Sequence, residues 1–125
     1  MTDFTILGQT VRTPRKTLES FPTPVGVTEV ELTSDEVTAL CPVTGQPDWY
    51  TVTIRYSPGD LCVESKSLKL YLWSFREEGH FCEALASQIA QDISQAINPQ
   101  WVEVQVKSTP RGGIAITSRA VWEGE

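Results

Sequence analysis

A short loop of the chain brings a thiol and a carboxyl group close together. Cys41 and Asp48 are seven positions apart and are separated by Pro42, Gly45 and Pro47. Because proline fixes φ and cannot donate to a strand ladder, this pattern predicts a shaped loop rather than one face of a helix or strand. Such a loop can direct a nucleophile and a proton donor into one pocket. The alternative is a structural cysteine beside a turn-forming aspartate. From the spacing alone this structural interpretation is the favoured one, because structural cysteines are usually inert.

The composition narrows the classes of function. The chain has 125 residues, of which 40% are hydrophobic and 21% charged, as is typical of one soluble globular domain. A net charge of −6 argues against direct nucleic-acid binding, although a few lysines could still hold a small anionic cofactor. Three cysteines without a CxxC motif and a single histidine predict no metal site and suit the reducing cytoplasm. We expect neither a signal peptide nor a membrane span.

The elements that must position this loop can be predicted from hydrophobic periodicity. Residues 1–24 contain three prolines and are predicted as an extended arm without regular structure, before a single domain over 25–125. Residues 34–40 are expected to form a short helical turn. Alternation of apolar and polar residues predicts strands over residues 25–33, 49–56, 101–107 and 114–118. Residues 61–64 are predicted as a short extended piece.

Two helices are predicted in the middle of the chain. The first runs from Ser65, its expected N-cap, to about residue 78, and the second from about 81 to 97. The order β-β-α-α-β-β predicts an α+β layer, an antiparallel sheet with two antiparallel helices on one face. Exposed sheet edges and exposed aromatic residues predict that subunits join edge to edge in a ring.

Three longer motifs occur in the chain: CPVTGQPD at residues 41–48, ESKSLKLY at 64–71 and TPRGG at 109–113. Together they resemble the QueF family of NADPH-dependent 7-cyano-7-deazaguanine (preQ0) reductases of queuosine biosynthesis. The resemblance covers about residues 34–118 and matches the short, single-domain branch of the family. It implies the tunnelling fold (T-fold), whose subunits assemble into ring barrels with active sites between neighbours.

The resemblance also implies a reaction, the reduction of a nitrile to an aminomethyl group with two NADPH per turnover. Cys41 would add to the nitrile carbon to form a thioimidate, and Asp48 would donate a proton as general acid. For this Cys41 must be thiolate-like, through local positive charge or proton transfer to Asp48.

The remaining site residues follow by position. The substrate would be contacted by Val63, Glu64, Ser65, Phe81, Cys82 and Glu83, with Glu83 accepting from the donor edge of the base and Phe81 stacking on it. NADPH would be contacted by Ser65, Lys66, Lys69, Arg111 and Gly112. Without the resemblance, Glu83 is an acid in a first helical turn, Phe81 a core aromatic, the lysines a solvated face and residues 109–113 a plain turn.

One position departs from the family pattern, because Cys82 stands where the family has histidine. A thiol is a weak donor and cannot reproduce an imidazole, and His80, two residues earlier, is a candidate replacement. A further hypothesis is a protective disulfide between Cys41 and Cys82 under oxidation. Cys62 is predicted to be a buried strand residue.

Several functions compete on this fold. The preferred one is a cytoplasmic, homo-oligomeric preQ0 reductase with no direct nucleic-acid or membrane partner. The alternatives are a QueF-like amidinotransferase that acts on preQ0 in tRNA, and a non-catalytic purine- or pterin-binding T-fold protein. The acidic composition and the 64–71 motif favour the reductase over the transferase, and the presence of both Cys41 and Asp48 counts against the binding protein.

Overall fold

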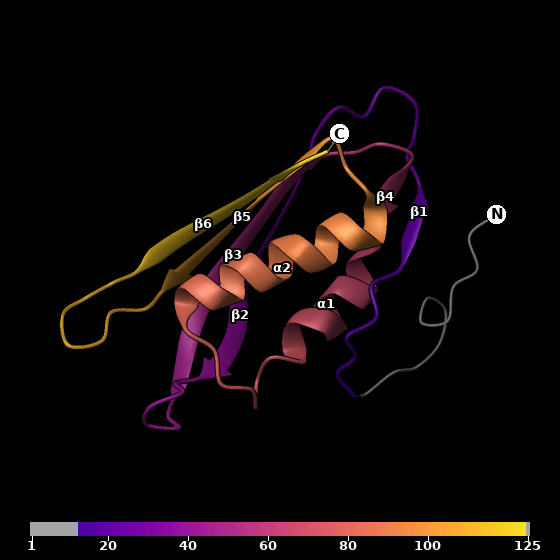
Figure 1. Ribbon diagram of the computed structural model, residues 1–125. Coiled ribbons are helices and arrows are strands. Elements are labelled where there is room, and N and C mark those ends of the chain that lie inside the picture. The colour runs from indigo at the N-terminus through magenta and orange to yellow at the C-terminus, as the bar shows by residue number, and fades with distance from the viewer. Residues whose placement is uncertain (1–12, 125) are drawn as a thin grey trace.

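The computed structural model describes residues 13–124 and consists of an antiparallel sheet with two helices on one of its faces (Figure 1). The main sheet has four strands in the order β2-β3-β5-β6, and a second sheet pairs β1 with β4. The helices run in opposite directions across the main sheet (Figure 1). The elements are β1 (Ser20–Pro22), β2 (Val30–Leu40), β3 (Pro47–Ser57), β4 (Leu61–Val63), α1 (Ser65–Trp73), α2 (Cys82–Ile97), β5 (Trp101–Ser108) and β6 (Thr117–Glu123). The predicted α+β layer, an antiparallel sheet with two antiparallel helices on one face, is confirmed (Figure 1).

The core lies between the sheet and α2. Alternate residues of β3 and β5 point to the helices and are buried, as the period of two along a strand requires. On α2 the buried residues recur at helical spacing and pack against these strands. The members of this core include Tyr50, Val52, Ile54, Tyr56, Leu85, Ile89, Ile93, Ile97, Val102, Val104 and Val106. Cys62 is also buried, as predicted.

The helical turn predicted for residues 34–40 is wrong, because this segment continues β2. A register shift between Ser34 and Val37 marks a bulge, and Asp35 and Glu36 in it are exposed. Beyond the bulge the strand pairs again with β3 and buries Val37 and Ala39 in the core. For residues 34–40, pairing with β3 and burial in the core outweigh the local capping signal of the sequence. The strand predicted for residues 25–33 begins only at Val30.

The first helix is shorter than predicted. It ends at Trp73, and bonds such as Arg76 N to Trp73 O, 3.1 Å, tighten the following residues into turns. The chain is then held against the end of β2, because Leu40 N donates to Glu78 O at 2.8 Å and His80 N donates to Leu40 O at 3.0 Å. These two bonds place the link between the helices beside the β2–β3 hairpin.

Two further predictions are corrected at the ends of the chain. The last strand covers residues 117–123 rather than 114–118, because the whole of β6 pairs with β5, from Lys107↔Thr117 to Trp101↔Glu123. The arm is not free of regular structure, since β1 lies within it and pairs with β4. Residues 1–12 of the predicted arm lie outside the described residues. Within 13–124, no helix combines the length and apolar character needed to cross a membrane.

Candidate active site

Cys41 opens the loop of the β2–β3 hairpin. Its N–H donates to Gln46 O at 2.8 Å, and its carbonyl accepts from Gly45 N at 2.8 Å. Gly45 has φ +72°, a left-handed conformation that glycine adopts without strain. Asp48 lies just beyond the loop on β3, opposite Ala39. The shaped loop predicted from the prolines is therefore present, and it leaves the Cys41 side chain partly exposed.

The loop lowers the pKa of the Cys41 thiol below its ordinary value. The largest cause is a hydrogen bond from the Thr44 side chain, followed by the backbone amides of Thr44 and Val43. Burial and the negative charge of Asp48 act in the opposite direction but are smaller. Hydrogen bonds to the charged form favour the thiolate, so the hairpin itself favours ionisation of Cys41.

Arg111 joins the loop between β5 and β6 to this hairpin. Its guanidinium forms an ion pair with Asp48, donates from Nη2 to Gln46 Oε1 at 2.6 Å, and donates from Nη1 to Pro47 O at 3.3 Å. Gly112 and Gly113, which follow, have φ of +61° and +80° and let the loop turn back. The resemblance assigns Arg111 to the cofactor, whereas here it contacts the carboxyl group of Asp48.

Tyr50 shows that the start of α2 lies close to the hairpin. It is buried, and its pKa is raised to about 12. Burial is the largest cause, and negative charge from Asp48, Cys82, Cys41 and Glu83 adds to it. This agrees with the backbone bonds Leu40 N–Glu78 O and His80 N–Leu40 O, which place the link before α2 beside the hairpin. Glu83 itself is exposed in the first turn of α2.

Cys82 points into the protein, away from solvent. Its Sγ lies 3.4 Å from Val106 O and accepts from Ser118 Oγ at 3.5 Å. Burial raises the pKa of its thiol, which keeps it protonated. All three cysteines are free, so the hypothetical disulfide would require Cys82 to leave these contacts with β5 and β6.

His80 is engaged elsewhere. Its Nε2 lies 2.9 Å from Glu78 Oε1, and its ring packs edge-on against Phe75 with centroids 5.3 Å apart. It lines a separate hollow together with Lys16 and Asp92. These contacts give no support to the hypothesis that His80 replaces the missing imidazole.

The junction of β4 and α1 forms a second group of predicted residues. Val63 and Glu64 are buried there, and the Glu64 carboxylate accepts from Lys66 N at 2.7 Å and from Ser67 N at 2.8 Å. Glu64 is therefore the N-cap of α1, and the prediction of Ser65 is wrong. The longer side chain of Glu64, in extended backbone just before the helix, reaches both free amides.

The two groups lie at opposite ends of α1. Figure 1 shows the β4–α1 junction at one end of the helix and the β2–β3 hairpin at the other. Nine helical residues span about 13 Å at 1.5 Å per residue. The link before α2 therefore lies beside the hairpin that carries Cys41 and Asp48, whereas Val63 and Glu64 lie at the other end of α1 (Figure 1).

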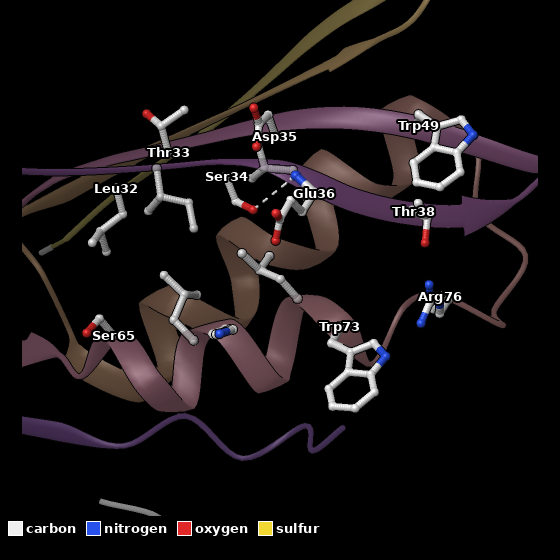
Figure 2. Close-up of a pocket in the computed structure, with 15 residues that line it drawn as sticks. Leu32, Thr33, Ser34, Asp35, Glu36, Thr38, Trp49, Ser65, Trp73 and Arg76 are labelled. Carbon is white, nitrogen blue, oxygen red and sulfur yellow. Dashed lines mark hydrogen bonds between the residues drawn. The ribbon is translucent and has the colours of Figure 1, made fainter. Parts of the chain in front are cut away.

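A cavity of about 570 Å³ lies between β2, β3 and α1 (Figure 2). Ser65, Lys69, Trp73 and Arg76 line it from the helix side, and Ser65 lies near one end while Arg76 and Trp73 lie toward the other (Figure 2). Trp49, which directly follows Asp48, also lines it. Sequence analysis missed Trp73 and Arg76. Trp73 could have been found from its spacing of four positions from Lys69 on one helical face, whereas Arg76 lies in the turns after α1, where helical spacing does not apply.

Comparison with known proteins places these features in a family. A family model described as "QueF-like protein" matches residues 47–124. The chain belongs to the QueF family. It is 50% identical over 110 residues to an NADPH-dependent 7-cyano-7-deazaguanine reductase of Anaeromyxobacter sp. (strain Fw109-5), covering 85% of this chain and 90% of that protein. A reductase of the same name from Thiobacillus denitrificans (strain ATCC 25259 / T1) is 47% identical over 104 residues, covering 82% of this chain and 75% of that protein.

Among solved structures, this QueF-family chain is similar to the archaeosine synthase QueF-Like in the apo form. The TM-score is 0.73 at 26% sequence identity, and the match covers 78% of this chain and 96% of the other. The family predicted from the three motifs is confirmed, and so is its fold.

Proposed function

We propose that this protein is an NADPH-dependent 7-cyano-7-deazaguanine reductase, which converts preQ0 to its aminomethyl product in queuosine biosynthesis. The observation that carries the proposal is the 50% identity, over most of both chains, to a reductase of that name. The hairpin supports it, because a partly exposed cysteine with a lowered pKa stands beside a carboxyl group. A thiolate suits this reaction, since a nitrile carbon is a poor hydride acceptor until a nucleophile has added to it.

In the proposed mechanism, Cys41 Sγ attacks the nitrile carbon and a C–S bond forms. The thiol proton passes to Asp48 and from there to the nitrile nitrogen, which gives a neutral thioimidate. NADPH, when bound, supplies one hydride to each of the two reductions. Between the reductions the C–S bond breaks, Cys41 leaves as a thiolate, and the imine stays in the site. The second reduction also takes up one proton at the imine nitrogen, and a second proton from solvent restores the Cys41 thiol, so that the nitrile, two hydrides and two protons give the aminomethyl product.

Asp48 has two roles in the proposed mechanism, and Arg111 contacts its carboxyl group. In the proposed mechanism, Asp48 accepts the thiol proton before it donates one. Asp48 then serves first as base and next as acid. Arg111 fixes the position of this carboxyl group.

In this proposal the substrate binds at the start of α2. The Glu83 carboxylate is exposed and can accept from the amino and ring N–H groups of a deazaguanine. Phe81 is 55% exposed directly before the helix, where a flat ring can stack on the base.

We further propose that the active site is completed by a second copy of the chain. Val63, Glu64 and Ser65 lie at the far end of α1, so in one chain they do not reach the hairpin. Strands β2 and β6 are edge strands of the four-stranded sheet, and each can pair with a neighbour. In a homo-oligomeric ring, pairing of these edge strands would bring residues 63–65 of one subunit to the hairpin of the next. The ring would act in the cytoplasm on free preQ0.

The amidinotransferase alternative is less well supported. The archaeosine synthase structure is only 26% identical to this chain, against 50% for the reductase. A net charge of −6 is also unfavourable for an enzyme that must hold tRNA.

The test mixes purified protein with preQ0 and NADPH and follows the thioimidate and NADPH absorbance bands. We expect two NADPH consumed per preQ0, and loss of both signals in Cys41→Ala but not in the control Cys62→Ala. A thioimidate band without NADPH consumption would contradict the reductase and favour the transferase or binding function. Absence of the band in the wild-type protein would contradict the role of Cys41.

A further inference from the structure

The cavity between β2, β3 and α1 has the character of a nucleotide site. Its volume of about 570 Å³ falls within the range of about 300–1,000 Å³ that small-molecule sites occupy. Two indole side chains line it, Trp49 at 52% and Trp73 at 38% exposure, and large exposed aromatic residues at a cavity are typical of ligand contacts. Two basic side chains, Lys69 and Arg76, line the same space.

The basic wall of the cavity is available to an anion. Asp35 and Glu36 lie across from it on the β2 bulge (Figure 2), yet within residues 13–124 no ion pair joins them to Lys69 or Arg76. A cation after the end of a helix has an ordinary explanation in the helix dipole, which fits Arg76. Lys69 lies inside α1, where that explanation does not apply, and it lines the same cavity.

The start of α1 is the competing place for a phosphate, and it is already filled. The Lys66 and Ser67 amides donate to the Glu64 carboxylate at 2.7 Å and 2.8 Å. A buried carboxylate there both occupies the amides and repels an anion. A phosphate of the cofactor is thus better placed along the helix, toward its other end.

We propose that this cavity binds the adenosine end of NADPH, with Arg76 and Lys69 holding the 2′-phosphate and Trp73 packing against the adenine. The inference rests on the proposed reductase function and adds Arg76 and Trp73 to the cofactor site. Arg76 determines the preference for NADPH over NADH, since that phosphate is all that distinguishes the two. The carboxylates of the bulge can accept from ribose hydroxyls and confine the phosphate to the helix side. Trp49, next to Asp48, marks the end of the cavity nearest the hairpin.

The test uses calorimetric binding of NADP⁺ and NAD⁺ to the full-length protein, which needs no turnover. We expect the wild type to bind NADP⁺ at least about tenfold more tightly, in keeping with hydrogen bonds to a charged group. Arg76→Ala should bring the ratio of the two affinities close to one, and Arg76→Lys should recover part of it. Trp73→Ala should weaken both ligands alike and leave the ratio unchanged.

The matched control is Arg119→Ala, which removes an exposed arginine of β6 outside the cavity and should change neither affinity. An unchanged ratio in Arg76→Ala would overturn the assignment of the 2′-phosphate, and unchanged affinities in Trp73→Ala would overturn that of the adenine. Thioimidate formation with preQ0 needs no cofactor and shows that each variant is folded. If the wild type reduces preQ0 but Arg76→Ala keeps its ratio, only this inference fails. If the wild type forms no thioimidate and consumes no NADPH, the proposed function fails.

Discussion

Replacing Arg111 by alanine separates two roles for this residue. The resemblance to the family assigns it to NADPH, whereas in the structure its guanidinium contacts Asp48, Gln46 and the carbonyl of Pro47. If Arg111 positions Asp48, the first chemical step should suffer, and that step requires no cofactor. If Arg111 serves the cofactor alone, thioimidate formation should not change.

The magnitudes can be worked from the exposure of the groups. The Arg111 side chain is 47% exposed and that of Asp48 19%, so the ion pair contributes only about 0.2–1 kcal/mol to folding. With the two weaker hydrogen bonds we expect a loss of about 1 kcal/mol, or a fall in Tm of about 2–8 °C. Catalysis should lose more, because a misplaced proton carrier costs about 10²-fold in rate, equivalent to about 2.7 kcal/mol.

The assay is stopped-flow absorbance of the thioimidate with preQ0 alone, together with a thermal melt. Arg111→Lys is the matched variant, since it keeps the charge but not the planar fork, and it should fall between wild type and alanine. A thioimidate rate within about twofold of wild type in Arg111→Ala would refute the positioning role. A change confined to NADP⁺ affinity would restore the cofactor role.

Three further predictions concern other residues of the site. Alkylation by iodoacetamide should modify Cys41 first and reach half-maximal rate at a pH below that of an ordinary cysteine, while Cys82, buried and with a raised pKa, reacts more slowly. Thr44→Val removes the largest cause of the lowered pKa of Cys41 and should shift that midpoint upward; an unchanged midpoint would contradict the account of the loop. Glu64→Ala should cost about 2 kcal/mol in urea unfolding by removing two capping bonds, and Glu64→Gln should cost less; equal stability of Glu64→Ala and wild type would contradict the capping role. Glu83→Gln should weaken preQ0 binding about tenfold or more without a change in unfolding, and unaltered binding would exclude Glu83 from the substrate site.

The sequence predicted the layers of the fold because burial enforces periodicity. Alternation in residues 49–56 and the helical stripe of α2 could be read directly, since each element must bury one face. The errors lie where long-range pairing decides the backbone. Residues 34–40 carry a capping signal but pair with β3. The last strand lies at residues 117–123 rather than 114–118, because its position is set by pairing with β5.

For the site, the sequence by itself identified the family and predicted the reacting groups. Cys41, its prolines and Asp48 are adjacent in the chain, so their loop could be predicted locally. Only the tertiary structure decided that Arg111, 63 positions from Asp48, meets its carboxylate, that Glu64 caps α1, and that Cys82 turns against β5 and β6. The cavity between β2 and α1 likewise exists only in the tertiary structure. These contacts depend on how the sheet folds back on itself and on where a helix ends, and no local pattern of residues encodes either.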